Sequence, residues 1–207
     1  MRGARTDVHL VKTDKDGAFE WQSTFGAEDV SESGQCVVPA AGGGYRIAAS
    51  PWYEITGYDL WLLKTDHLGI LQWPQLIDWP DADHARCIGL TADSGFAVTG
   101  YTQSFDAEYD YDGYILKLDK YGVESWALPY GSAHPYDETA NHICYTSDGG
   151  YLMCGYIRDA SVQKDVYVVK TDRLGAIEWT SRVGGTYHDE GWCCIETSDG
   201  GYAVSAS

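Results

Sequence analysis

The 207-residue sequence has few basic residues and no long apolar run. It contains 14 Lys and Arg against 31 Asp and Glu, which gives a formal net charge of −17. A chain this acidic repels phosphate backbones and anionic membrane surfaces, so nucleic acid is not expected as a partner. No stretch approaches the roughly 18 apolar residues of a membrane span, and residues 1–7 contain no apolar signal-peptide core. Membrane insertion is therefore not expected.

Common signatures of catalysis and of metal clusters are also missing. The sequence contains no Gly-x-Ser-x-Gly elbow and no Cys-x-x-Cys pair, and its six histidines are scattered. We therefore expect a protein that is not an enzyme. The cysteines are predicted to be free thiols that act as small buried hydrophobes; they are Cys36, Cys87, Cys144, Cys154, Cys193 and Cys194.

Two motifs recur four times along the chain. The first, Lys-Thr-Asp-x-x-Gly-x-x-x-Trp, ends at tryptophans that are 52, 53 and 53 residues apart, with Leu118 replacing Thr in the third copy. The second is a glycine-containing turn followed by an aromatic residue, as in Asp-Gly-Gly-Tyr at residues 148–151. The repeated tryptophans are Trp21, Trp73, Trp126 and Trp179. A period near 50 residues indicates a propeller or a solenoid.

The third repeat predicts four antiparallel strands. Apolar runs at residues 141–146 and 151–156 flank an Asp-Gly-Gly turn, which is a strong hairpin signal. Further strands are expected at residues 165–172 and 176–183. Strands such as 166–169 are apolar on both faces, as expected for sheets that are covered on both sides. Four strands in about 50 residues make one blade of an all-β propeller.

The four predicted blades cover a single domain, residues 1–207. Residues 202–207 have the pattern of a second strand and residues 7–14 that of a third, so the chain starts and stops inside one blade. The terminal hairpins can then complete each other and leave no open sheet edge. Four blades in a monomer and eight blades in a homodimer fit the count equally well. The blade boundaries are about 32–79, 83–131 and 138–184, with the split blade formed by 189–207 and 7–26.

The two motifs together resemble the blade repeats of secreted bacterial and archaeal β-propeller proteins. They are more loosely similar to quinoprotein-like propellers, whose blades carry an Asp…Gly…Trp signature. The resemblance implies an extracellular or cell-surface binding or scaffold protein. The Asp-to-Gly spacing is one residue shorter here than in the quinoprotein pattern, and no organic cofactor is expected.

Residues present in every repeat are best explained by blade geometry. The tryptophans are predicted to fill the wedge between adjacent blades, since aromatic rings bury the largest area per residue. The aspartates of the Lys-Thr-Asp motif are predicted to accept hydrogen bonds from backbone N–H groups of the following turn. Four further acids precede the first strands and could converge in a ring that binds Ca²⁺, or each could bond the backbone of its own loop. These acids are Glu32, Asp83, Glu138 and Asp189.

Residues that differ between repeats are the candidates for function. They are mostly aromatic and acidic, and they occur in loops predicted to open on one face of the propeller. Exposed rings beside carboxylates can stack on sugars or anchor a protein partner, so a glycan or protein ligand is expected. The alternatives are a glycan-active hydrolase that uses loop carboxylates, or rings that pack beneath their own loops. The predicted ligand-binding residues are Trp52, Tyr53, Trp79, Tyr109, Tyr111 and Tyr136.

Overall fold

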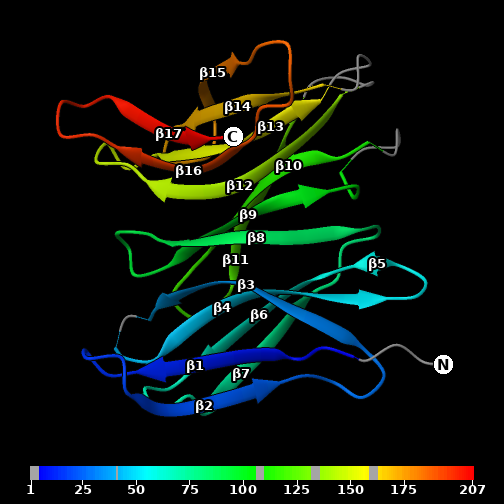
Figure 1. The fold of residues 1–207 in the computed structure, drawn as a ribbon, viewed down its shortest axis with the longest axis vertical. Helices are drawn as coiled ribbons and strands as arrows, with labels where there is room; N and C mark the ends of the chain where they lie inside the picture. Colours follow the sequence, from blue (N-terminus) through cyan, green and yellow to red (C-terminus); the bar gives the residue numbers. More distant parts are fainter. Residues whose placement is uncertain (1–4, 41, 106–109, 132–135, 159–162) are drawn as a thin grey trace. The chain divides into compact units, whose positions relative to one another are not determined.

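The computed structural model describes residues 5–40, 42–105, 110–131, 136–158 and 163–207, and the regular elements in these ranges are all β-strands (Figure 1). This confirms the predicted all-β class. The described part of the chain contains no helix of the length and apolar character that a membrane span requires. The chain forms two compact units, residues 1–85 and 86–207.

The first unit contains a two-stranded antiparallel sheet and a larger antiparallel sheet. The small sheet pairs β1 (Val8–Thr13) with β2 (Phe19–Phe25). The larger sheet has the order β3-β4-β6-β7, with β5 beside β4. Its strands are β3 (Ser31–Pro39), β4 (Tyr45–Tyr53), β5 (Gly57–Tyr58), β6 (Leu60–Thr65) and β7 (Leu71–Ile77). A buried apolar cluster joins the two sheets and contains Val8, Leu10, Phe25, Ile47, Ala49 and Leu63.

The second unit contains most of one four-stranded antiparallel sheet, a complete second one and a hairpin. The first sheet has the order β11-β10-β9-β8 and contains β8 (Asp83–Leu90), β9 (Phe96–Thr102), β10 (Asp112–Leu118) and β11 (Glu124–Tyr130). The second has the order β12-β13-β14-β15 and contains β12 (Asp137–Tyr145), β13 (Tyr151–Arg158), β14 (Lys164–Thr171) and β15 (Ile177–Val183). Strand β12 contacts β9 and β10. The hairpin of β16 (Gly191–Glu196) and β17 (Tyr202–Ala206) packs on β12 and β13.

The four strands predicted for the third repeat correspond to β12, β13, β14 and β15. Their antiparallel order confirms the expected four-stranded unit. Strand β12 begins at Asp137, four residues earlier than predicted. The first half of this strand is mostly polar, so the apolar pattern used for the prediction marked only its second half. The register between β12 and β13 shifts between Ala140 and His142. Equivalent shifts occur between β3 and β4 and between β16 and β17.

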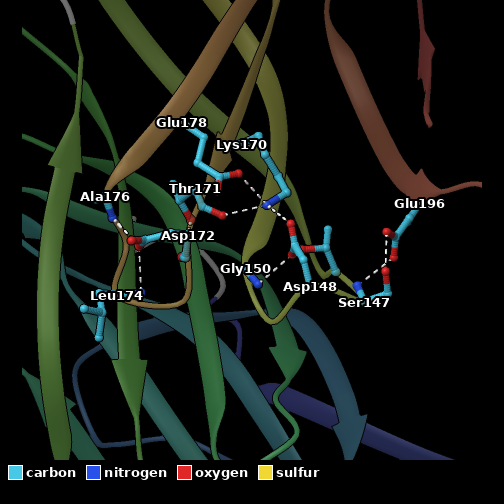
Figure 2. A network of polar contacts seen from close by, with 11 residues as sticks. Ser147, Asp148, Gly150, Lys170, Thr171, Asp172, Leu174, Ala176, Glu178 and Glu196 are labelled. Atoms are coloured by element: carbon cyan, nitrogen blue, oxygen red, sulfur yellow. Dashed lines mark hydrogen bonds and ion pairs between the residues drawn. The ribbon is translucent and has the colours of Figure 1, made fainter. Parts of the chain in front are cut away.

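A repeated polar network explains the Lys-Thr-Asp motif (Figure 2). Asp172 Oδ1 accepts hydrogen bonds from the backbone N–H groups of Leu174 at 2.8 Å and Ala176 at 2.9 Å. Asp14, Asp66 and Asp119 make the same two contacts in their own turns. These contacts confirm the turn role predicted for the aspartates.

Three of the repeated tryptophans contact the sheet of the next repeat. Trp126 of β11 contacts Tyr151 of β13 edge-on, with ring centroids 5.9 Å apart. Trp21 contacts Tyr45 at 5.8 Å within the first unit, and Trp179 contacts Tyr202 at 5.5 Å within the second. In each case the tryptophan of one repeat meets the tyrosine of the next. The contacts between successive sheets that the wedge prediction requires are therefore present for these three rings, although Trp179 remains 38% exposed.

Candidate functional site

The candidate site is an open pocket in the first unit, between the end of β4, the segment before β6 and the end of β7. Its volume is about 470 Å³. Strand β4 supplies Tyr53, the segment before β6 supplies Asp59, and the end of β7 leads to Asp78. The complete lining is Tyr53, Glu54, Ile55, Thr56, Asp59, Leu76 and Asp78.

Asp59 occupies a position that is aspartate in every repeat. Its equivalents are Asp7, Asp112 and Asp165, each directly before or at the start of the third strand. In those three repeats the opposite residue, one past the fourth strand, is Gly26, Gly131 or Gly184. A Cβ atom at any of these glycines would overlap the facing carboxylate oxygen. The aspartate therefore uses space that only glycine leaves open.

The repeat that contains β6 and β7 departs from this pattern because Asp78 replaces the glycine. Leu60 pairs with Ile77, so Asp59 and Asp78 flank the same end of the β6–β7 ladder. Two carboxylates thus line one cavity where the other repeats have a single carboxylate against a glycine. Because this pair of carboxylates distinguishes one repeat from the others, the cavity is a stronger candidate for a functional site than a feature that all the repeats share.

The electrostatics of the cavity follow from the burial of Asp59. Its side chain is only 2% exposed, and within the described residues its Oδ1 has no hydrogen-bond partner. Burial, and then the charge of Asp78, raise the pKa of Asp59 to about 6. Burial also raises the pKa of Tyr53, with further contributions from Asp59, Glu32 and Asp78. Asp59 Oδ1 is therefore a buried carboxylate oxygen that accepts no hydrogen bond from the described residues.

A second cavity of about 340 Å³ lies nearby in the same unit. It is lined by Thr6, Ser31, Glu32, Ser33, Trp52 and Tyr58. Trp52 is 46% exposed and pairs with Tyr58 across β4 and β5. Because successive residues of a strand point to opposite faces, Trp52 and Tyr53 line different cavities. The structure thus places two of the predicted ligand residues beside carboxylates.

The other predicted ligand residues have different surroundings. Trp79 follows Asp78 and is half-buried. Tyr111 and Tyr136 belong to the second unit, where the Tyr111 ring packs edge-on against Tyr101 at 5.0 Å. This contact is the local packing that the sequence offered as an alternative to ligand binding. Tyr109 lies outside the described residues.

The four acids predicted to bind calcium divide between the two units. Glu32 and Asp83 lie in the first, and Glu138 and Asp189 lie in the second. Glu32 Oε1 accepts a hydrogen bond from the N–H of Ala27 at 2.8 Å, and Asp189 Oδ2 accepts one from Gly185 at 3.0 Å. Each of these two carboxylates therefore bonds its own loop. In the described ranges, no group of three or more His, Cys, Asp or Glu residues is arranged to hold a metal ion.

A histidine–cysteine cluster in the second unit could not be predicted from spacing. His142 Nδ1 lies 3.5 Å from Cys194 Sγ, and Cys193 Sγ lies 3.7 Å from His142 Nε2. The Cys194 thiol is fully buried, and its thiol neighbours and burial raise its pKa. A thiol in this environment remains protonated and unreactive, so Cys194 acts in packing. All six cysteines are free, as expected. Three of them are buried, but Cys36 and Cys144 are half-buried and Cys193 is exposed.

The comparisons with known proteins returned no family. No protein-family model matches the chain, and no curated protein matches it either. Function must therefore be inferred from the site itself. The pairing of Asp59 with Asp78 was not predicted from the sequence, although Asp78 aligns with Gly26, Gly131 and Gly184 of the other repeats.

The raised pKa of Asp59 predicts a specific pH dependence of stability. Its folded pKa of about 6 is higher than the ordinary value of 3.8, so the stability that it contributes is fully present below pH 4 and is lost as the pH rises through 6. Relative to Asp59→Asn, the wild-type free energy of unfolding should fall by roughly 2 kcal/mol between pH 4 and pH 7. Urea titrations across this range measure the difference. Parallel curves for the two proteins would contradict the assignment.

Proposed function

We propose that the protein is a non-catalytic binding module that recognises a neutral glycan through the two cavities of the first unit. The observation that carries the proposal is the buried, unpartnered carboxylate oxygen of Asp59 in a cavity of about 470 Å³. Such an oxygen needs a hydrogen-bond donor, and sugar hydroxyl groups supply donors in pairs. Asp78 offers a second acceptor at the same end of the ladder.

The aromatic residues support the same class of ligand. Trp52 is 46% exposed and Tyr58 is 38% exposed, and both line the neighbouring cavity. Half-exposed rings provide flat apolar surfaces that can stack on the C–H face of a sugar. The net charge of −17 disfavours sulfated or sialylated glycans, which carry negative charge themselves. Neutral glycans therefore fit best, and a protein partner is the other ligand class expected from these rings.

Binding should depend on the residues that distinguish this repeat. A glycan array identifies the ligand, and calorimetry then compares the wild type with Asp78→Gly, which installs the residue found in the other three repeats. We expect Asp78→Gly and Trp52→Ala each to weaken binding at least about tenfold. Tyr121→Ala is the matched control, because its ring is 69% exposed in a turn of the second unit. Equal affinities for all four proteins, or no glycan bound on the array, would refute the proposal.

One observation favours a second candidate function, a glycan-active hydrolase. A general acid must hold its proton near neutral pH, and the pKa of Asp59 is raised to about 6 while Asp78 faces the same cavity. Incubation of the bound glycan with the protein, followed by chromatography of the products, separates the two functions. Cleavage that disappears in Asp59→Asn would establish the hydrolase and replace the binding module.

We also propose that the four-stranded sheets are propeller blades. The strand order and the tryptophan–tyrosine contacts between successive sheets support this architecture. The repeat resemblance supports a location outside the cell or at its surface. Calcium would bind only if the carboxylates of Glu32, Asp83, Glu138 and Asp189 met, and an unchanged melting temperature in calcium and in chelator would exclude that.

A further inference from the structure

The buried lysine of the Lys-Thr-Asp motif uses all of its hydrogen-bond donors in the sheet that begins with β12. Lys170 Nζ donates to Asp148 Oδ2 at 2.8 Å, and to Thr171 O and Glu178 Oε2 at 2.9 Å each (Figure 2). An ammonium group carries three N–H donors, so each donor of Lys170 has an acceptor. The Lys170 side chain is only 1% exposed. This lysine therefore has a purely structural role.

Lys117 is the equivalent lysine of the preceding repeat, and it has one acceptor fewer. Its Nζ lies 2.9 Å from both Asp93 Oδ2 and Leu118 O. Ser125 occupies the position of Glu178, and within the described residues Lys117 Nζ has no third acceptor. The Lys117 side chain is 8% exposed. One N–H donor of a largely buried ammonium group is therefore available to a ligand.

A β-bulge explains why this one position decides the state of the lysine. Glu178 is the extra residue where the register between β14 and β15 shifts after Lys170. A bulge changes the direction in which a side chain points, and here it brings the carboxylate to the lysine. Glu20 holds the same position in the first unit and bonds Lys12 at 2.9 Å. Ser125 is the extra residue between β10 and β11, and its short side chain supplies no carboxylate.

Lys117 lines a pocket that lies within the second unit. Its volume is about 390 Å³, and its walls come from β10 and from the turns β8–β9, β12–β13 and β14–β15. The side chains that matter for binding are Asp93, Lys117, Tyr145, Tyr151, Arg173 and Leu174. The pocket is therefore formed where the turns of two successive four-stranded sheets meet.

The other walls supply a second cation and apolar surface. Arg173 is exposed, and it forms no ion pair in the described ranges. Tyr145 is 37% exposed and packs edge-on against the buried Tyr151 ring at 5.7 Å. Leu174 is 62% exposed. The pocket thus combines two cationic groups with an aromatic and aliphatic surface.

The charge balance favours a ligand with a single negative charge. Burial raises the pKa of Asp93, but hydrogen bonds from Thr91, Lys117 and Gly95 outweigh it and lower the pKa to about 2. Asp93 is therefore charged at neutral pH and offsets Lys117, which leaves the charge of Arg173. A phosphate dianion would be repelled by Asp93 and by the chain's net charge of −17. A carboxylate also matches the planar guanidinium fork of Arg173.

We propose that this pocket binds a small organic carboxylate, whose oxygens accept hydrogen bonds from Lys117 Nζ and Arg173. The apolar part of the ligand then lies against the Tyr145 ring. Both donors are charged, so the contacts belong to the stronger class of hydrogen bonds. The site is formed by the second unit alone, and the proposal is independent of the glycan site.

Benzoate is a suitable probe because it carries one carboxylate on an aromatic ring. It should bind with a dissociation constant of about 1 mM in calorimetry. In nuclear magnetic resonance titrations it should shift the backbone amide signals of Thr91, Gly149 and Arg173, which line the pocket. Benzamide lacks the charge and phenyl phosphate carries a larger one, so each should bind at least about tenfold more weakly.

Ser125→Glu tests the donor of Lys117 without removing any group that lines the pocket. It installs the acceptor that Glu178 provides in the next repeat, so it should occupy the third donor and weaken benzoate binding at least about tenfold. Ser125→Ala leaves the donor open and should bind benzoate like the wild type. Arg173→Gln should weaken binding at least about tenfold, because it removes the charged fork.

Lys120→Gln is the matched control for Arg173→Gln, because it makes the same charge change in a turn that does not line the pocket. It should keep the affinity for benzoate within about twofold, since exposed charges are screened by salt. Circular dichroism checks that each variant is folded, and Arg173→Gln decides if Ser125→Glu does not fold. Benzoate that shifts none of the pocket amides overturns the proposal. Equal affinities for benzoate and benzamide, or unchanged binding to folded Ser125→Glu, also overturn it.

Discussion

Gly150→Ala should destabilise the protein by about 3 kcal/mol, although it adds a single methyl group. Gly150 lies in the turn between β12 and β13, and a Cβ atom there would overlap the backbone carbonyl oxygen of Thr171 and crowd Lys170 Nζ. A backbone atom within a sheet cannot move aside as a flexible side chain can. The methyl group must therefore separate β13 from β14 or displace the buried Lys170 side chain from Asp148. Overpacking of this kind costs one to several kcal/mol.

The measurement is chemical denaturation of the two proteins with a matched glycine control. Gly185→Ala is suitable because nothing lies within 4 Å of its Cβ site and its backbone is not left-handed. We expect that control to change stability by less than about 0.5 kcal/mol. A similar small loss for Gly150→Ala would mean that the glycine turn is not held against β14.

Trp126→Ala should destabilise the second unit by about 3 kcal/mol. The ring contacts Tyr151 of the next sheet at 5.9 Å, and a Cβ atom at Gly175 would overlap two atoms of the indole. The indole therefore fills the space between two sheets, and its loss leaves a cavity that the backbone cannot close. Large-to-small changes at such positions cost about 3–5 kcal/mol, and the partial exposure of the ring places this one at the lower end.

Trp179→Ala provides the internal comparison. Its ring is 38% exposed and contacts Tyr202 of the terminal hairpin at 5.5 Å. Because less area is buried, the loss should be smaller than for Trp126→Ala by at least about 1 kcal/mol. Trp126→Phe should recover part of the stability. Equal losses at both tryptophans would show that the contact between sheets is not what stabilises Trp126.

The recurring parts of the fold were predictable because a feature that is present in every repeat reflects the geometry that the repeats share. The turn aspartates, the tryptophan wedge and the four-stranded unit each appear several times in the sequence, so each prediction had several independent examples. The Asp172 contacts and the Trp126–Tyr151 pair are the structural counterparts of those patterns. Periodicity in a sequence is thus direct evidence about local packing.

The candidate site was harder to predict because its chemistry depends on a pairing across strands. Tyr53 and Trp52 were identified as unmatched aromatics, but Asp59 resembled any other repeated aspartate. Only the ladder between Leu60 and Ile77 brings it opposite Asp78. Burial then changes the behaviour of the carboxyl group, and burial cannot be deduced from an acidic residue type. Similarly, spacing alone did not reveal that His142 and Cys194 are neighbours.

The contact between the tryptophan of one repeat and the tyrosine of the next determines how such a chain can grow. Trp21 contacts Tyr45, and Trp126 contacts Tyr151, so at both places the tryptophan of one repeat packs on the tyrosine of its successor. A duplicated segment of about 52 residues would contain both the tryptophan and the tyrosine that form these contacts with the neighbouring repeats. Gene duplication can therefore lengthen the array by whole repeats without any compensating substitution at the new interface.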